Sequence, residues 1–383
     1  MKSISLRIIL AIILLSGLAA CKQNEPDGPV TDRPVDVRIV VSNGSATRSA
    51  GDTETDNDIR QLRVYAFNSN GVLVGYAEDD NLSNQSYLYI TLREAGNIYF
   101  YVIANADFGP RPTVDGVEVS DWSSLSATQL QKLRFDLTGF NGWPQIDGNS
   151  LSPMSNNRVD EEGNDMQYQN DFATAVQVVS PSTTTQIIPV TVQHVLGRLR
   201  LLLNKEPGND DMKITVTRAE LFHRPDDYKL YLNNNAPADI DSHITFVNNS
   251  EQLVDRIISP DAPVELVSKP ADGYTEIART FLAPNQHGTY DMTGAAFTDA
   301  AGAPTETGKD KAYRLELTVQ FEYTPSNGVS ASVSERNYTL YLPSVPRNTS
   351  IEVEGTLNGT TDLQFNLLTK VWQEREMTIP PFM

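Results

Sequence analysis

The sequence predicts an all-β protein of two tandem β-sandwich domains with a few short helices. Two observations support this fold class. Short segments in which apolar and polar residues alternate recur along most of the chain, and turns rich in Gly, Pro and Asn separate them. Many short strands joined in this way are typical of β-sandwiches. The chain of 383 residues leaves room for two domains of ordinary size.

The first twenty residues have the pattern of a secretory signal peptide. Lys2 and Arg7 precede an apolar run over residues 8–15, and small residues follow up to Cys21. Such a run is too short to span a membrane as a helix. Its ending, LAAC, resembles a bacterial lipobox, in which the cysteine is lipidated. Because Cys21 is the only cysteine in the sequence, we expect a lipid anchor there and no disulfide within the chain.

The charge balance argues against nucleic acid as a partner. The chain has 30 basic and 49 acidic residues, a net charge of −19. Removing Lys2 and Arg7 with the signal leaves 28 basic residues against 49 acidic ones, or −21. A surface of this sign repels phosphate backbones. Residues 22–34 are polar and contain prolines, so we expect an extended tether there.

The first strand is expected directly after this tether, because apolar residues occupy every second position there. These residues are Val35, Val37, Ile39 and Val41. Asn70-Gly71, between two apolar runs, predicts a hairpin turn. The further segments with strand patterns are residues 59–78, 85–92, 97–107, 187–204, 212–223, 312–323, 331–343, 349–359 and 363–372.

Two short helices are expected among these strands. One lies within residues 126–135, where Ser126 and Gln129 have the spacing of a capping box. The other is expected over residues 250–258. A break near Pro181 predicts that an N-terminal domain ends at residue 181 and that a C-terminal domain begins at residue 182.

The sequence predicts no enzyme, no cofactor and no metal site. Four histidines lie in separate segments, without the i, i+4 spacing of a zinc-binding helix. These are His194, His223, His243 and His287. The chain has no G-x-S-x-G elbow and no phosphate-binding glycine loop, and Cys21 is expected to carry lipid rather than act as a nucleophile.

Two further groups of residues have a functional and a structural interpretation. The acidic loops at residues 52–58 and 160–165 resemble calcium ligands but lack the full alternating pattern with its closing glutamate, so we expect solvated loops. Trp122, Trp143 and Trp372 would suit a sugar-stacking platform, although large aromatic residues in sandwiches usually pack in cores.

Five segments after the lipobox occur in a characteristic order. The third ends in ANAD, and in the fourth Arg347 and Asn348 precede an alternating strand. The segments are VDVRIVVSNGSATRSAG (35–51), IRQLRVYAFNSNGVLVGY (59–76), IYFYVIANAD (98–107), VPRNTSIEVEGTLNG (345–359) and LQFNLLTKVW (363–372). Together they resemble the fimbrillins, the pilins of type V pili in Bacteroidales, over nearly the whole chain. Two departures are the lack of an aromatic residue after Arg347-Asn348 and a charged, proline-rich tail.

The resemblance implies transthyretin-like sandwich domains and maturation by proteolysis. In fimbrillins a lipidated precursor reaches the outer membrane and is cut by an arginine-specific protease after its first strand. A C-terminal strand of the neighbouring subunit then fills the resulting groove. Applied to this chain, Arg48 is the recognition residue and Ser49 the mature N-terminus. The implied regions are a signal peptide (1–20), a tether with the removable strand (21–48), an N-terminal domain (49–181) and a C-terminal domain with a donor tail (182–383).

The candidate donor strand lies in the tail, where apolar residues recur before Pro380 and Pro381 end any β-ladder. Its candidate residues are Leu363, Phe365, Leu367, Val371, Met377 and Ile379. On pattern alone, this segment and the first strand are equally well ordinary internal strands. On composition alone, Arg48 is a solvated loop cation. The resemblance favours the exchange interpretation of all three.

The implied function is a structural pilus subunit of the stalk type, because an anchor would not need Arg48 and the patterned tail can donate a strand. Its partners would be other pilin subunits with tip and anchor proteins, the protease, and a host or bacterial surface ligand. Its location would be the outer membrane as a precursor and then a cell-surface fimbrium. Three alternatives stay open: a tip or accessory pilin that binds glycans, a surface glycan-binding lipoprotein that does not polymerise, and a secreted hydrolase, which would need carboxylates that converge in a cleft.

Overall fold

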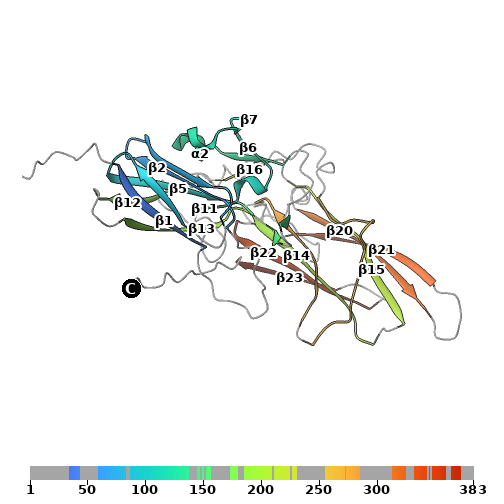
Figure 1. Ribbon diagram of the computed structural model, residues 1–383. Coiled ribbons are helices and arrows are strands. Elements are labelled where there is room, and N and C mark those ends of the chain that lie inside the picture. Colours follow the sequence, from blue (N-terminus) through green and yellow to red (C-terminus); the bar gives the residue numbers. More distant parts are fainter. Residues whose placement is uncertain are drawn as a thin grey trace, which may run out of the picture.

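In the computed structural model, most of the described residues lie in β-strands, which are arranged in several sheets (Figure 1). The structure describes residues 34–43, 59–82, 87–137, 145–146, 149–150, 152–156, 173–179, 185–208, 211–224, 227–230, 255–271, 273–284, 313–324, 332–342, 345, 347–358 and 364–371. Within these ranges a single α-helix and two 3₁₀ helices accompany the strands. The predicted all-β class is therefore confirmed.

The elements of the N-terminal half are mostly short strands. They are β1 (Val35–Asn43), β2 (Leu62–Asn68), β3 (Leu73–Asp79), β4 (Tyr87–Leu92), β5 (Gly96–Ala104), η1 (Ala106–Phe108), β6 (Arg111–Val114), β7 (Val117–Glu118), η2 (Trp122–Ser124), α2 (Ala127–Gln131), β8 (Arg134–Asp136), β9 (Gln145–Ile146), β10 (Asn149–Ser150), β11 (Met154–Ser155), β12 (Thr174–Val178) and β13 (Gln186–His194).

The C-terminal half contains longer strands. They are β14 (Gly197–Lys205), β15 (Met212–Phe222), β16 (Asp227–Lys229), β17 (Asp255–Ile258), β18 (Val264–Glu265), β19 (Glu276–Leu282), β20 (Arg314–Tyr323), β21 (Ser332–Tyr341), β22 (Thr349–Leu357) and β23 (Gln364–Val371).

The N-terminal sandwich has two layers that β11 and β13 join. One layer has the order β13-β1-β4, and the other contains β3, β2 and β5, with β12 also paired to β5. Every second residue of these strands faces inward, as the two-residue period of a strand requires. The inward side chains form one core, with contributions from Val64, Ile90, Phe100 and Val190.

Two predicted local features are confirmed in this half. Asn70-Gly71 turns β2 into β3, with Gly71 at a φ of 74°, and the Asn68 carboxamide oxygen accepts a hydrogen bond from the N–H of Val72 at 3.0 Å. Helix α2 begins at the predicted capping box, in which the backbone N–H of Gln129 donates to Ser126 Oγ.

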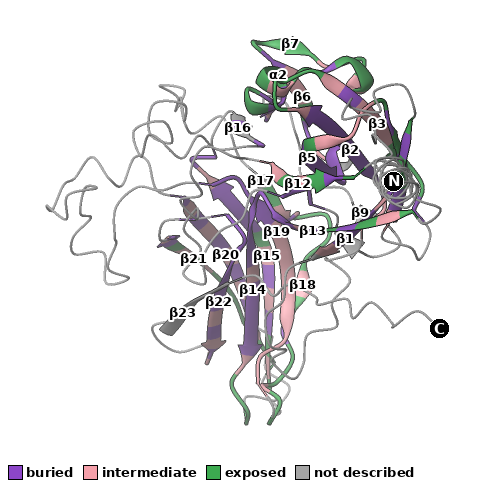
Figure 2. Cartoon of the chain, turned by 90° about the vertical axis from the view of Figure 1, so that its left-hand side faces the viewer, coloured by how far each residue is buried: buried purple, intermediate pink, exposed green. Residues whose placement is uncertain are grey.

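A small sheet of order β16-β8-β6-β7 lies with α2 against the outer face of the β2–β5 layer (Figure 2). The side chains between this small sheet and the β2–β5 layer form a separate hydrophobic core, which includes Tyr65, Phe67 and Phe135. Leu196 and Phe281, from the second half of the chain, pack in the same core. This core therefore joins the two halves, and the sequence pattern did not predict it.

The C-terminal sandwich packs a sheet of order β19-β14-β22-β23 against one of order β17-β15-β20-β21, with β18 also paired to β15. Its core includes Leu201, Val216, Leu317 and Val353. In Figure 1 the strands β15, β20 and β21 extend away from the N-terminal sandwich. Strand β22 runs parallel to β14 and antiparallel to β23.

The prediction of a helix over residues 250–258 is wrong for the part of this segment that the structure describes. Residues 255–258 form strand β17, which pairs with β15, and Ile258 is buried in the C-terminal core. Pairing along a sheet edge and burial of an isoleucine outweigh a local helical pattern. Residues 250–254 lie outside the described part of the chain.

The sheet pairing also bears on the domain boundary. Strand β13 follows Pro181, yet it pairs with β1 and contributes Ile188, Val190 and Val192 to the N-terminal core. A boundary at residue 181 would separate this strand from its sheet. We therefore propose that the N-terminal domain extends to His194.

Candidate functional site

Strand β1 lies inside a sheet, between two neighbours. It runs parallel to β13, with Ile39 opposite Ile188, and antiparallel to β4, with Ile39 opposite Leu88. Seven residue pairs connect it to β13 and six connect it to β4. The first strand that the structure describes is therefore paired along both of its edges, and β13 and β4 are joined only through it in this layer.

The inner face of β1 carries the four predicted apolar residues. Val37, Ile39 and Val41 have no exposed surface, and Val35 is 4% exposed. All four belong to the N-terminal core, where Ile90 of β4 and Val190 of β13 are among their neighbours. The prediction that they share one buried face is confirmed.

The outer face of β1 makes polar contacts with β4. Thr91 Oγ1 donates a hydrogen bond to Asp36 Oδ1 at 2.6 Å, and these two residues are opposite each other in the register. The guanidinium carbon of Arg38 lies 4.0 Å from the centroid of the Tyr87 ring. The ring of Tyr89, which is 61% exposed, meets that of Tyr87 edge to face at 5.8 Å.

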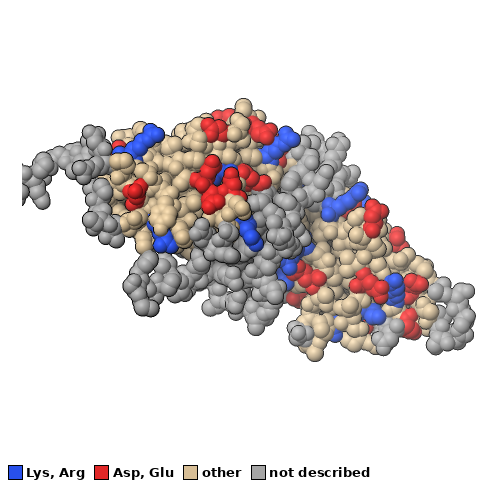
Figure 3. Space-filling view, in the orientation of Figure 1, with Lys and Arg blue, Asp and Glu red and all other residues tan. Residues whose placement is uncertain are grey.

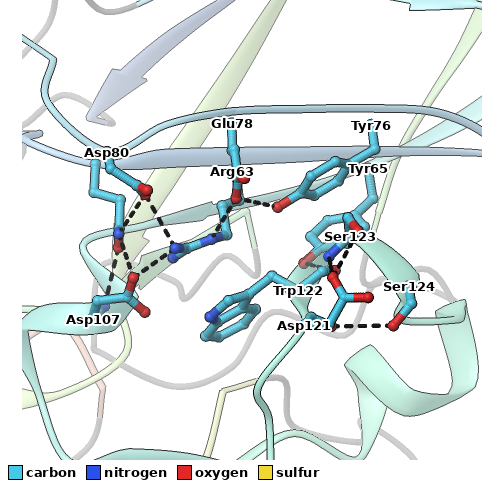
Figure 4. A network of polar contacts seen from close by, with 11 residues as sticks. Arg63, Tyr65, Tyr76, Glu78, Asp80, Asp107, Asp121, Trp122, Ser123 and Ser124 are labelled. Carbon is cyan, nitrogen blue, oxygen red and sulfur yellow. Dashed lines mark hydrogen bonds and ion pairs between the residues drawn. The ribbon is translucent and has the colours of Figure 1, made fainter.

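A second polar cluster lies on the other layer, around Arg63 of β2 (Figure 4). The Arg63 side chain is 3% exposed, its Nη2 donates to Asp107 Oδ2 at 2.6 Å and to Asp80 Oδ1 at 3.1 Å, and its guanidinium carbon lies 4.6 Å from the Trp122 ring centroid. Burial opposes the charged form, but the hydrogen bond and charge of Asp107, with Asp80, outweigh it and raise the pKa of Arg63.

Tyr76 belongs to the same cluster. Burial and its hydrogen bond to Glu78 raise the pKa of the Tyr76 hydroxyl well above its usual value. The acidic side chains in contact with Arg63 are all partly exposed, so Arg63 is the buried charge of the cluster. The acidic groups compensate its positive charge. The cluster joins β2, β3 and η1, and we assign it a structural role.

The model of the family described as major fimbrial subunit protein (FimA) matches residues 35–141 of this chain. The match begins at the first residue of β1 and includes β1 to β8. The match covers 107 of the 383 residues of the chain, which resemble this family. Over this stretch the predicted resemblance to the fimbrillins is confirmed, and the match supports a fimbrial subunit. This family consists of structural subunits and is not a class of enzymes.

Solved structures of fimbrial and adhesion proteins are similar over most of the chain. No curated protein matches it. A fimbrilin (FimA) from Porphyromonas gingivalis has 13% identity and a TM-score of 0.46, covering 91% of this chain and 100% of its own. The tip fimbrial protein Mfa3 from the same species, truncated at its C-terminus, has 16% identity and a TM-score of 0.46, with coverages of 88% and 100%. A candidate cell adhesion protein from Bacteroides eggerthii has 15% identity and a TM-score of 0.49, with coverages of 90% and 98%. TM-scores below 0.5 carry no weight for function.

The fimbrillin motif ANAD has a clear structural role here. Asn105 follows β5 with a φ of 56°, a left-handed conformation that asparagine tolerates better than most residues. Its buried Oδ1 accepts hydrogen bonds from the N–H groups of Arg60 at 2.9 Å and Gln61 at 3.2 Å. Asn105 therefore fixes the start of β2 beside the end of β5.

The Arg-Asn motif of the fimbrillin pattern lies where the two halves meet. Arg347 is 2% exposed, and its charge acts on the buried hydroxyl of Tyr228 in the small sheet. Asn348 has a φ of 51°, and its N–H donates to the carbonyl of Leu196 at 2.9 Å. Strand β22 follows, with Ile351 and Val353 buried as the alternation predicts.

Several predicted site residues lie outside the described part of the chain, so the predictions for them stay predictions. They are Cys21, Arg48, Ser49, Leu363, Met377 and Ile379. The acidic loops at residues 52–58 and 160–165, His243, His287, Trp143 and Trp372 also lie outside it.

The remaining candidate donor residues lie in β23. This strand pairs antiparallel with β22 of the same chain, with Phe365 opposite Gly355, Leu367 opposite Val353 and Val371 opposite Thr349. Strand β23 is at the edge of its sheet. The structure thus does not bring these residues near β1 as pairing partners.

Two predicted histidines are described, and both are buried. Ser152 Oγ lies 2.7 Å from His194 Nδ1 where β11 meets β13, and burial, with the charge of Arg198, holds the pKa of His194 well below its usual value. His223 is 5% exposed. A serine beside a histidine suggests a nucleophile, but a solvent-excluded pair suits the junction of two strands. The described residues contain no group of three potential metal ligands.

The described surface mixes charges of both signs. Figure 3 shows acidic and basic side chains interspersed on the face that it draws. Among the residues that the structure describes, no helix is long and apolar enough to cross a membrane.

Proposed function

We propose that this chain is a structural, stalk-type subunit of a cell-surface pilus that assembles by strand exchange. In this proposal the precursor is exported as a lipoprotein through Cys21 and cut after Arg48 by an arginine-specific protease. Strand β1 then leaves, and a strand from another subunit takes its place. The observation that carries the proposal is the position of β1, the first described strand, which is paired along both edges and built into the core.

The position of β1 accounts for the stability of the precursor. Four buried apolar side chains contribute about 1.5–3 kcal/mol each, so a cut strand would leave only when an equivalent strand replaces it. Before cleavage, β1 acts as a built-in chaperone for its own domain. Cleavage removes the covalent link and makes replacement by another strand irreversible.

The groove that β1 would leave has the features needed for strand addition. Its edges are β13 and β4, whose backbone groups now pair with β1. Its floor is the N-terminal core, including Leu88, Ile90 and Val190. An open edge beside exposed apolar surface strongly favours a new strand, with backbone hydrogen bonds giving affinity and alternate side chains giving register.

A second copy, or another pilin, would supply the new strand from its C-terminal stretch. Strand β23 is an edge strand, which can separate from its sheet without disturbing other pairings. Each subunit would then offer a groove at one site and a donor at another. Such a head-to-tail contact generates a filament unless its rotation closes a ring.

The stalk role rests on Arg48 and on the tail. An anchor subunit would keep its lipid and need no cleavage site after the first strand. A tip subunit would need a groove but no donor strand. Tip and anchor proteins would be the partners at the two ends of the fibre, and a host or bacterial surface ligand the target of adhesion.

The test is to treat the purified, unlipidated precursor with an arginine-specific protease. The expected result is a new N-terminus at Ser49 and a ladder of oligomers that persists on heating in detergent. Oligomer formation is followed by electrophoresis and size-exclusion chromatography. A product that is cut after Arg48 but stays monomeric would refute the strand-exchange proposal, and cleavage elsewhere with Arg48 intact would refute the maturation site.

A further inference from the structure

The inner face of β1 supplies little information about register. Its side chains are Val35, Val37, Ile39 and Val41, which are nearly the same in size and polarity. A shift of one residue would turn them outward, but a shift of two residues leaves an apolar side chain at nearly every inner position. The core therefore excludes odd shifts and tolerates even ones.

The outer face distinguishes the registers that the inner face does not. In the observed register Asp36 lies opposite Thr91 and Arg38 lies opposite Tyr89, from where its guanidinium reaches diagonally over Tyr87. A shift of two residues one way breaks the Asp36–Thr91 hydrogen bond and places Asp36 opposite Tyr89, near aromatic faces that repel an anion, and Arg38 directly opposite Tyr87 instead of diagonal to it. A shift of two residues the other way places Val40 opposite Tyr89 and Arg38 opposite Thr91.

Arg38 is held mainly through the aromatic ring. Its Nε is buried and has no hydrogen-bond partner among the described residues, and the contact described for its guanidinium is that with Tyr87 at 4.0 Å. A cation over a ring in a partly desolvated position is more strongly bound than one in water. On the other side of β1, the register partner of Arg38 is the apolar Ile187.

We infer that Tyr87 and Thr91 of β4 select the register of the strand in this groove, by requiring a basic residue over Tyr87 and a hydrogen-bond acceptor beside Thr91. For β1 these residues are Arg38 and Asp36. The extension to assembly rests on the proposed function: an incoming strand from a second copy of this chain would carry a basic residue at the position of Arg38.

Register is measurable in the full-length, unlipidated chain by cysteine cross-linking, with Cys21→Ser to remove the native thiol. Val40→Cys with Pro189→Cys reports the observed register, since these residues are partners on the outer face. Val40→Cys with Ile187→Cys, or with Thr191→Cys, reports a shift of two residues one way or the other. Disulfides form only between cysteines whose Cα atoms lie about 4.4–6.8 Å apart, so each pair is specific for one register.

The decisive variant is Tyr87→Leu, which removes the ring but keeps apolar bulk. The ratio of shifted to native cross-links should rise about 5- to 30-fold, the range expected for a partly buried cation over a ring. Tyr87→Phe keeps the aromatic face and should give the native ratio. Tyr89→Leu is the matched comparison on the same strand and should change the ratio less than about 2-fold, since its ring is not the one beneath the guanidinium.

Two results would overturn the inference. One is an unchanged ratio in Tyr87→Leu, and the other is an equal change in Tyr87→Leu and Tyr89→Leu. Arg38→Lys should retain the native register and Arg38→Glu should lose it. The conservative pair, Tyr87→Phe and Arg38→Lys, keeps the test valid if a harsher variant fails to fold.

Assembly separates this inference from the proposed function. After cleavage, Tyr87→Leu chains should form oligomers about 5- to 30-fold more slowly than Tyr87→Phe chains. Equal rates would overturn the extension to the incoming strand and leave strand exchange intact. Wild-type chains that are cut but never assemble would refute the proposed function, while the cross-linking result for β1 would still stand.

Discussion

Strands β1 and β22 occupy equivalent places in the two sandwiches but are held in different ways. Each lies between a parallel neighbour and an antiparallel one, β13 and β4 for β1, and β14 and β23 for β22. Each presents alternate buried residues to its own core. The same local architecture thus appears once with a strand at the start of the described chain and once with a strand in its interior.

The difference lies in connectivity and in the outer face. Strand β22 is preceded by the Arg347-Asn348 corner, and its outer face carries Glu352, which accepts a hydrogen bond from Arg200 at 2.9 Å while only 5% exposed. Strand β1 has the Asp36–Thr91 bond and the Arg38–Tyr87 contact on its outer face instead. We propose that a single cut frees β1, whereas no single cut would free β22.

The largest expected effect comes from the proposed cut. Arg48→Ala should abolish cleavage after the first strand, and with it oligomer formation, while the precursor folds normally. The measurement is N-terminal sequencing and electrophoresis after protease treatment, with thermal unfolding as the check on folding. Arg111→Ala is the matched control, because Arg111 is 77% exposed on β6 and has no proposed role in assembly. Normal oligomers from the Arg48→Ala chain would disprove the cleavage mechanism.

A second large effect is expected at the other end of the chain. Truncation after Thr369 removes Val371, Met377 and Ile379 from the proposed donor and should block assembly of cut subunits. The truncated chain should still accept a strand in its own groove, because β1 and its neighbours are unchanged. Mixing it with intact subunits should therefore shorten fibres by capping them, as seen by electron microscopy. If truncated chains assemble alone, the donor strand lies elsewhere.

The comparison also predicts matched losses of stability. Ile39 and Ile351 are both fully buried, one in each core. Replacing either with Ala should cost about 2–5 kcal/mol of unfolding free energy, because the mutation removes buried methyl groups and leaves a cavity. Calorimetry of the uncut chain measures both. After cleavage and strand replacement, we expect only Ile351→Ala still to destabilise the subunit, since Ile39 would have left with β1.

The sequence allowed much of this architecture to be predicted, because strands and turns depend on local patterns. The alternation at Val35 to Val41, the Asn70-Gly71 hairpin and the Ser126–Gln129 cap were all confirmed. The strand at residues 255–258 was mistaken for a helix, because its pairing with β15 is not encoded locally. The predicted boundary near Pro181 did not take account of the parallel pairing of β13 with β1, which joins residues about 150 positions apart.

The contacts on the outer face of β1 could not be predicted from the sequence either. Asp36 and Arg38 look like ordinary solvent-facing residues in the pattern, and Tyr87 and Tyr89 like one more alternating strand. Only the register, which places Arg38 opposite Tyr89 and Asp36 opposite Thr91, shows what they do. The left-handed conformations of Asn105 and Asn348 were hidden for the same reason, although asparagine before or after a strand is a usable signal for such a corner.

A smaller effect is expected from the ion pair on the outer face of β22. Glu352→Gln keeps the shape of the side chain but removes the negative charge beside the partly buried Arg200. The loss should be about 1–3 kcal/mol, because Arg200 keeps its ion pair with Glu276 at 2.5 Å. Asp36→Asn on β1 should cost less than about 1 kcal/mol, since its contact with Thr91 is exposed. Chemical denaturation compares the two, and equal losses would contradict the stronger hold on β22.

The last expected effect is a dependence of the N-terminal sandwich on pH. His194 ends β13, and burial lowers the pKa of its imidazole, with a smaller effect from Arg198. The unfolded chain therefore binds a proton at a higher pH than the folded one does. Stability should be complete above the ordinary histidine pKa of 6.5 and should fall as the pH is lowered toward the depressed folded value.

His194→Gln should flatten this pH dependence in the uncut chain, because glutamine does not titrate. The slope that is lost should not exceed about 1.4 kcal/mol per pH unit, the limit for one proton. His223→Gln is the comparison, since His223 lies in the C-terminal sandwich. Acid-induced unfolding followed by tryptophan fluorescence measures both. If β13 carries the pH sensitivity, acid should loosen the parallel partner of β1 and leave β14, the parallel partner of β22, in place.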